Sequence, residues 1–145
     1  LPVVEERGIS ARIIAGSLYG ASSPVKTHSD LFYADVQMVA GSALPLPVDH
    51  EERGVYVAEG EIDVAGQSFT EGRLLVFRPG DHITLRAKGN ARVMLLGGEP
   101  MDGPRFVWWN FVSSRKETMI AAAHEWEAGR MGKVPGDEQE FIAMR

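Results

Sequence analysis

Two short segments of this sequence carry side chains of the types that bind metal ions. Asp49 and His50 stand together in a polar run, and His82 follows the turn-forming residues Pro-Gly-Asp at 79–81. Imidazole and carboxylate groups are common ligands of first-row metals. Asp49, His50 and His82 could therefore form a metal site with only three protein ligands. The structural interpretation is favoured, because charged runs usually lie in solvated loops and the sequence around His82 is typical of a turn.

The other candidates for chemistry are isolated from one another. His28 lies in a segment rich in Ser and Pro, and His124 lies in a helical segment, so neither has a partner at metal-ligand spacing. Ser113 and Ser114 precede a helix and are better explained as helix caps than as nucleophiles. Cysteine is absent, which excludes disulfides, thiolate metal sites and a cysteine nucleophile.

The charge pattern argues against a partner made of phosphates. The formal net charge is −5, and the basic residues near the C-terminus alternate with acidic ones. Gly97 and Gly98 follow a strand-like segment but lack the Lys-Ser/Thr that completes a phosphate-binding loop. We therefore expect no nucleic acid among the partners of this chain.

Alternating apolar residues predict that these side chains are positioned by short β-strands. Residues 31–39 alternate apolar and polar side chains, which is typical of a half-buried antiparallel strand. Residues 55–58 and 62–64 predict a hairpin that turns at Gly60, whereas residues 16–30 predict a long surface loop. About nine or ten such strands are separated by turn residues, as in a β-sandwich or barrel.

The C-terminal third has a different pattern. Residues 106–112, Phe-Val-Trp-Trp-Asn-Phe-Val, predict one strand that is bulky on both faces, so each face needs a cover. That cover is either a helix carrying Trp126 or a second domain. Ser114 to Glu117 match a capping box and predict a helix over 114–128 that stops at Gly129.

Length and composition fit one globular domain. The chain has 145 residues, of which 44% are hydrophobic and 24% are charged. No apolar stretch approaches the roughly 18 residues that a membrane span needs. The chain begins at Leu1 rather than at Met, so we expect it to be processed or cut from a longer protein.

The spacing of glycines and prolines resembles the cupins, small β-barrels whose first metal motif is Gly-x5-His-x-His-x3,4-Glu-x6-Gly. Alternate residues of one strand point into the barrel, so both imidazoles share the inner face. Here both glycines and the spacing are kept, but Pro47, Asp49 and Arg53 occupy the three ligand positions. The second cupin motif is Gly-x5-Pro-x-Gly-x2-His. Here Gly72 leads to Pro79-Gly80-Asp81-His82, so His82 lies close to the ligand position but out of step with it. The sequence does not decide whether Arg53 is a buried cation or a surface side chain.

Longer segments resemble the C-terminal half of the pirin family, in particular residues 31–36, 108–117 and 128–138. The resemblance covers essentially the whole chain. It implies a two-cupin parent protein whose N-terminal cupin binds iron through His and Glu residues. It also implies that the C-terminal cupin holds no metal, and some pirins act as quercetin 2,3-dioxygenases. No catalytic, cofactor-binding or metal residue is carried over to this chain.

We therefore expect a mainly β fold, a single cupin-type (jelly-roll) β-barrel with a C-terminal α-helix, within one domain spanning residues 1–145. Its expected parts are N-terminal strands and a loop (1–30), the barrel (31–112), the helix (114–128) and a tail (129–145).

The expected function is that of a metal-free C-terminal cupin with a structural or interaction role. Iron is expected only in an absent N-terminal cupin, and the parent protein is expected to be an iron-dependent quercetin 2,3-dioxygenase. The expected partner is that N-terminal cupin or a second copy in a homodimer, in the cytoplasm and away from membranes. The alternative is a stand-alone cupin dioxygenase that binds its metal through Asp49, His50 and His82.

Overall fold

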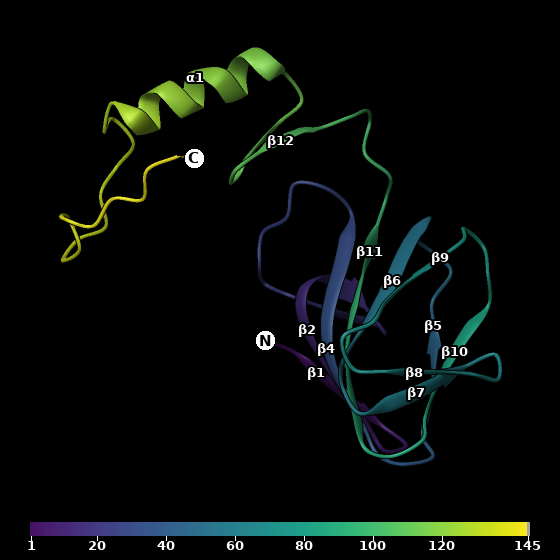
Figure 1. The fold of residues 1–145 in the computed structure, drawn as a ribbon. Coiled ribbons are helices and arrows are strands. Elements are labelled where there is room, and N and C mark those ends of the chain that lie inside the picture. The colour runs from purple at the N-terminus through teal and green to yellow at the C-terminus, as the bar shows by residue number, and fades with distance from the viewer. Residues whose placement is uncertain (145) are drawn as a thin grey trace. The chain divides into compact units, whose positions relative to one another are not determined.

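The computed structural model describes residues 1–144, which form thirteen β-strands and one α-helix in two compact units, Leu1–Pro100 and Met101–Arg145 (Figure 1). The strands of the first unit are β1 (Val3–Glu6), β2 (Ile9–Leu18), β3 (Ala21–Ser22), β4 (Leu31–Met38), β5 (Ala43–Leu46), β6 (Glu52–Glu59), β7 (Glu61–Val64), β8 (Gln67–Thr70), β9 (Leu74–Phe77), β10 (Ile83–Ala87) and β11 (Ala91–Gly98). The second unit contains β12 (Phe106–Trp108), β13 (Phe111–Ser113) and α1 (Lys116–Glu127). Across residues 1–144, no helix has the length and apolar character that crossing a membrane requires.

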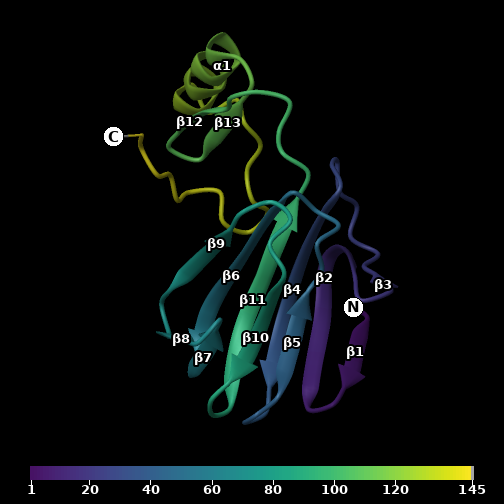
Figure 2. The same cartoon turned by 90° about the vertical axis from the view of Figure 1, so that its right-hand side faces the viewer.

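The first unit consists of two antiparallel sheets. The larger has the strand order β1-β2-β4-β11-β6-β9, with β3 added to β2, and Figure 2 shows these strands side by side from β9 to β1. The smaller has the order β5-β10-β7-β8. Neighbours in these orders are seldom consecutive in the chain, so the chain crosses repeatedly between the sheets. The prediction of a mainly β fold is confirmed.

The apolar core lies between the two sheets. In β4, the predicted alternation is confirmed, because Phe32, Ala34, Val36 and Met38 are buried while Tyr33 and Gln37 are exposed. Complete burial of one such aliphatic or aromatic side chain contributes about 1.5–3 kcal/mol. The larger sheet also buries Ala11, Ile13, Val55, Val57, Leu75, Val93 and Leu95, and the smaller sheet buries Leu44, Leu46, Ile62, Val64, Leu85 and Ala87.

The predicted hairpin at Gly60 is wrong. β6 pairs with β9 and β11 in the larger sheet, whereas β7 pairs with β8 and β10 in the smaller one. Gly60 has a φ of 80°, and a Cβ atom built there would overlap the carbonyl oxygen of Asn90. Only glycine combines this left-handed turn with so close an approach of another backbone, and the turn lets the chain cross between sheets.

The N-terminal residues contribute more to the sheet than predicted. β2 extends to Leu18, and β3 pairs with its end, so the predicted surface loop 16–30 is strand in its first part. β1 and β2 are integral strands of the larger sheet, and the first unit ends at Pro100. The sheet core therefore begins before residue 31 and ends before residue 112.

The second unit corrects the prediction of a single strand over 106–112. The segment forms two strands, β12 and β13, that pair as a hairpin. Trp109, in the turn between them, has a φ of 54°, and its ring centroid lies 5.2 Å from that of Trp126 on α1. The helix thus covers part of the aromatic hairpin, while Val107 and Val112 stay exposed.

The helix boundaries follow the prediction closely, but the capping box does not form. The N-cap is Arg115, which makes no side-chain cap, and the Arg115 amide donates a hydrogen bond to Ser113 Oγ at 3.1 Å. Gly129 ends the helix as predicted, with a φ of 66°. After it, residues 130–144 form no helix or strand, with one isolated bridge between Val134 and Asp137.

Candidate functional site

The position that carries the carboxylate ligand in cupins holds the buried cation Arg53. Along β6, Arg53 points into the core together with Val55 and Val57, and only 2% of its surface is exposed. Nη1 donates to the Pro47 carbonyl oxygen at 3.2 Å and Nη2 to the Arg78 carbonyl oxygen at 3.0 Å. The guanidinium therefore bridges the segment after β5 to the segment after β9. Its Nε is buried without a hydrogen-bond partner.

This donor set does not fit a metal ion. Pro47 has no side-chain donor atom, and Asp49 lies exposed in the loop before β6. A guanidinium keeps its charge at all ordinary pH values and repels a cation beside it. The alternatives left open for Arg53 are thus decided in favour of a buried cation.

His50 is packed rather than solvated. Its side chain is 12% exposed, its ring centroid lies 5.1 Å from that of Phe32, and Nε2 lies 3.3 Å from Asp30 Oδ1. The sequence placed His50 in a solvated loop, and that expectation is wrong because the ring covers the end of the core at Phe32.

The structure does not bring Asp49, His50 and His82 together as metal ligands. His82 and Asp49 are both exposed, in different loops. Among residues 1–144, no group of three or more His, Cys, Asp or Glu side chains is placed to hold one ion. His28 and His124 are exposed as well, in separate units.

The outer face of the larger sheet carries a feature that the sequence analysis missed. Strand register places Tyr33, Leu96, Gly54 and Val76 in one row across β4, β11, β6 and β9. The next row continues with Met94, Tyr56 and Leu74 on the same face. We call Tyr33, Gly54, Tyr56, Leu74, Val76 and Leu96 the outer apolar patch. In the sequence, the apolar run 74–77 indicates part of this patch, because its residues are apolar on both faces of the strand.

The patch is hollowed at Gly54. A groove of about 490 Å³ is lined by Gly54, Leu74, Val76 and Leu96 and by the charged residues Glu51, Glu52 and Arg53. A Cβ atom added at Gly54 would lie 3.2 Å from the Leu75 carbonyl oxygen, 3.7 Å from Leu96 Cγ and 3.8 Å from Leu74 Cδ1. The absence of a side chain at Gly54 therefore lets the backbone of β9 and two leucine side chains approach β6 closely.

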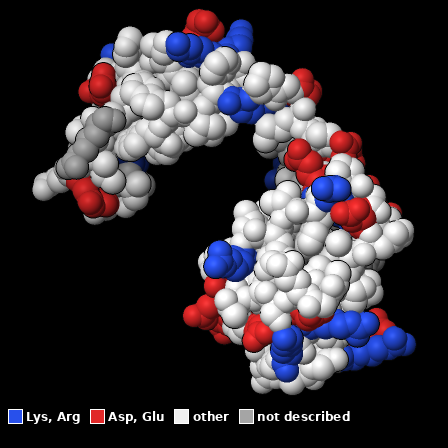
Figure 3. Space-filling view, turned by 45° about the vertical axis from the view of Figure 1, so that its right-hand side comes forward, with Lys and Arg blue, Asp and Glu red and all other residues white. Residues whose placement is uncertain are grey.

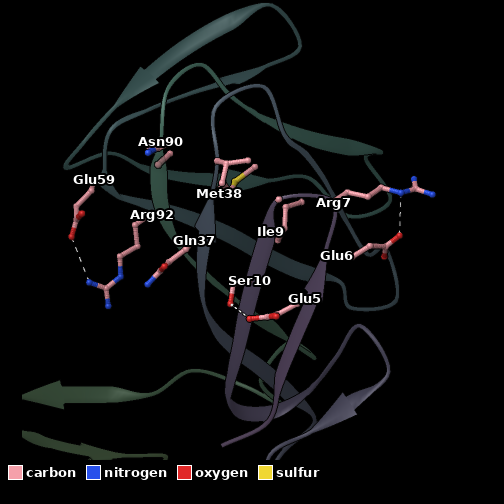
Figure 4. A pocket seen from close by; sticks show the side chains of 13 residues that line it. Glu5, Glu6, Arg7, Ile9, Ser10, Gln37, Met38, Glu59, Asn90 and Arg92 are labelled. Atoms are coloured by element: carbon pink, nitrogen blue, oxygen red, sulfur yellow. Dashed lines mark hydrogen bonds and ion pairs between the residues drawn. The ribbon is translucent and has the colours of Figure 1, made fainter.

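The same face becomes polar towards its other end. Arg92 Nε and Nη2 donate to Asp35 Oδ1 and Oδ2 at 2.8 and 2.9 Å, and this hydrogen bonding holds the pKa of Asp35 below its ordinary value. Glu59, Arg92, Gln37 and Ser10 come from four strands and line a pocket of about 720 Å³ (Figure 4). Because the positive charge of Arg92 is already paired with the negative charge of Asp35, this pocket is polar but carries no unpaired arginine.

A further cavity opens between the sheets beside Tyr19. The cavity has a volume of about 530 Å³, and its lining includes Ile9, Leu44 and Pro45. The Tyr19 hydroxyl donates to the Pro45 carbonyl oxygen at 2.9 Å, and burial raises the pKa of Tyr19. The hydroxyl thus serves to tie the end of β2 to β5.

Charges of both signs are distributed over the surface. On the face drawn in Figure 3, acidic and basic side chains lie next to one another in both units. In the second unit, Arg130 forms two hydrogen bonds with Glu125, at 2.7 and 2.6 Å. Such pairing matches the charge balance read from the sequence.

Comparison with known proteins agrees with this fold. Residues 33–132 match the pirin C-terminal cupin domain. A pirin-like protein of Caulobacter vibrioides is 43% identical over 144 residues, which are 99% of this chain and 50% of that protein. A pirin-like protein of Solanum lycopersicum is 28% identical over 138 residues, 91% of this chain and 47% of that protein.

Solved structures give the same result. Quercetin 2,3-dioxygenase from Acinetobacter baumannii superposes with a TM-score of 0.88 at 28% identity, covering all of this chain and 50% of that one. This likeness confirms the cupin-type fold, although the two sheets do not close into one continuous barrel. The chain spans about half the length of the relatives it matches. It belongs to the pirin family, and its residues 33–132 match that family's C-terminal cupin domain.

Proposed function

We propose that this chain is a metal-free cupin domain whose role is to pack against a second cupin domain. The observation that carries the proposal is Arg53, a buried cation where a cupin would hold a carboxylate ligand. A cation that is already committed to two carbonyl groups supports the domain's interior instead of binding metal.

The second unit supports an interaction role. Of residues 101–144, only Met119 and Ala123 are buried hydrophobic residues, while many large hydrophobic side chains are exposed. So small a core is insufficient to stabilise a unit of this size by itself. The exposed members are Met101, Phe106, Val107, Trp108, Trp109, Val112, Ile120, Val134, Phe141 and Ile142.

The activity of a longer parent protein is proposed from its relatives. A solved structure that matches the whole chain is named a quercetin 2,3-dioxygenase, and this chain covers half of it. We assign dioxygenase chemistry, with iron, to a parent that also contains an N-terminal cupin. The C-terminal domain would then shape access to the iron site. We also propose that the parent protein acts in the cytoplasm and has no nucleic-acid partner.

Metal analysis of the purified chain tests the proposal. After iron loading and desalting, we expect iron far below one equivalent and no turnover of quercetin under air. The Acinetobacter dioxygenase, treated in parallel, is the positive control. One equivalent of iron together with turnover would overturn the proposal, and their loss in His50→Ala and His82→Ala variants would establish the alternative metal site.

A further inference from the structure

The cavity beside Tyr19 lies on the open side of the first unit, between the edge strands of its two sheets. β1 is the last strand of the larger sheet and β5 is the last strand of the smaller one, and within residues 1–144 these two strands do not pair. The cavity between them has a volume of about 530 Å³. Sites for small molecules commonly have volumes of roughly 300–1,000 Å³, so this space is large enough for a ligand.

Two prolines keep this side of the sandwich open. The Ser42 carbonyl oxygen accepts from the Ala87 amide on β10 at 3.0 Å, so alternation turns the backbone groups of Pro45 and Pro47 to the opposite, free edge of β5. Proline has no N–H, and a strand edge that lacks these donors cannot pair with another strand. The gap between the sheets is therefore fixed by the sequence of β5.

The wall of the cavity is mostly apolar. Val4 and Ala11 are paired in register on β1 and β2, so their side chains share the face that lines the cavity. The apolar lining residues are Val4, Ile9, Ala11, Leu44, Pro45 and Pro47. Together with the Tyr19 ring, the two pyrrolidine rings offer broad, flat surfaces that suit an aromatic ring.

Tyr19 supplies a polar group to the apolar wall. It has a φ of 50°, in the left-handed region that bulky residues rarely adopt, within the turn that joins β2 to β3. Its hydroxyl donates to the Pro45 carbonyl oxygen at 2.9 Å, and burial raises the pKa of Tyr19, so the hydroxyl keeps its proton at ordinary pH. The phenol oxygen retains lone pairs with which to accept a hydrogen bond from a ligand.

Charge at the cavity favours a neutral ligand. Glu6 and Arg7 contribute one charge of each sign to the lining, and the Arg7 Nε atom lies 3.3 Å from Glu6 Oε1. These charges compensate each other, so neither an anion nor a cation is attracted. The cavity is also separate from the cupin metal position, because Arg53, which occupies that position, is not among the described residues that line it.

We propose that this cavity binds a small, neutral aromatic molecule that carries a hydroxyl group. The ring contacts the apolar wall, and the ligand hydroxyl donates a hydrogen bond to the Tyr19 phenol oxygen. This ligand-binding role is additional to the proposed packing role, because it involves neither iron nor a partner domain.

A titration of the full chain with 2-naphthol tests the proposal. Followed by ¹H–¹⁵N NMR, it should show one saturable site with a Kd below about 1 mM. The largest shifts should lie at Val4, Ala11, Tyr19 and Leu44. 2-Methoxynaphthalene has no hydroxyl hydrogen to donate, so its affinity, taken from the initial slopes of the shifts, should be about threefold to tenfold lower.

Val4→Trp fills the cavity and should weaken 2-naphthol binding by about tenfold or more. Val3→Trp is the matched control, because Val3 is the exposed neighbour of Val4 on β1 and points to the opposite face of the sheet. It should leave the affinity unchanged. Val4→Leu fills less of the space and should give an intermediate loss, and thermal melting of each variant without the probe checks that it is folded.

Three results would overturn the proposal. The first is the absence of saturable binding, or shifts confined to the outer apolar patch or to the second unit. The second is wild-type affinity in folded Val4→Trp and Val4→Leu variants; if Val4→Trp is unfolded, Val4→Leu and the shift map decide. The third is equal affinity for the two probes, which would show that the Tyr19 oxygen does not accept a hydrogen bond from the ligand.

Discussion

Arg92 holds Asp35 in a two-point contact that joins β11 to β4 on the outer face of the larger sheet. The two donor–acceptor distances are 2.8 and 2.9 Å, and Asp35 is only 7% exposed. A parallel pair of charged hydrogen bonds fixes the orientation of both side chains. The pair also lets a carboxylate lie beside the outer apolar patch.

Asp35→Asn should lower the free energy of unfolding at pH 7 by about 1–2 kcal/mol, because a charged hydrogen-bond acceptor is lost. Asp35 has a lowered pKa in the folded state, so its contribution is present above the unfolded-state pKa near 3.8 and disappears as the pH falls through the folded-state value. Urea unfolding at pH 7 and in acid measures this difference. Glu59→Gln, at an exposed carboxylate 3.5 Å from Arg92, is the control and should have little effect.

A constant difference between wild type and Asp35→Asn from pH 7 down through the folded-state pKa would contradict this account. It would show that the carboxylate charge contributes nothing and that only the shape of the side chain matters.

Gly60→Ala should lower the melting temperature much more than Gly66→Ala, although the two glycines have similar φ values of 80° and 84°. Both variants bear the cost of left-handed backbone, about 1 kcal/mol. At Gly60 the new methyl group also overlaps the Asn90 carbonyl, whereas nothing lies within 4 Å of a Cβ at Gly66. Thermal melting of the two variants compares these costs directly, and equal melting temperatures would contradict the close approach at Gly60.

Trp126→Phe should loosen the residues that follow α1 while leaving the first unit unchanged. The indole Nε1 donates to the Ile142 carbonyl oxygen at 2.9 Å, and the ring stacks on Phe141 at 5.5 Å. Phenylalanine keeps the stacking but loses the hydrogen bond, which is worth about 1 kcal/mol. Limited proteolysis should cut within residues 131–144 faster than in wild type. Ile120→Ala, on an exposed site of the same helix, should not change the cutting rate.

Periodicity predicted the parts of this fold that depend on local pattern. The inward residues of β4 and the stop at Gly129 follow from alternation and from glycine's conformational freedom. Pairing is different, because it depends on contacts between distant segments. Residues 55–64 resemble a hairpin locally, yet β6 finds its partners at β9 and β11.

In the candidate site, too, local pattern predicts some features, whereas contacts between distant segments determine the others. Motif spacing identified Arg53 as the residue at a ligand position. Its burial and its hydrogen bond to the Arg78 carbonyl, 25 residues away, depend on how distant segments pack, although its other partner, Pro47, is only six residues away. The outer apolar patch combines residues from four strands. The apolar run 74–77 signals only the part of the patch on β9, because each strand contributes only one or two of its members.

Arg53→Ala should lower the free energy of unfolding by about 3 kcal/mol, since it removes a large buried side chain and leaves two carbonyl groups without donors. Arg53→Lys keeps the charge but has one donor group in place of the planar fork, so it cannot reach both the Pro47 and Arg78 carbonyls with the same geometry. We therefore expect Arg53→Lys to be intermediate between Arg53→Ala and wild type in chemical denaturation. Arg86→Ala, at an exposed arginine on β10, is the control and should change stability by less than about 0.5 kcal/mol. If Arg53→Ala were as stable as wild type, the guanidinium would not be the bridge between these two segments, and the interior of the domain would have to be supported in another way.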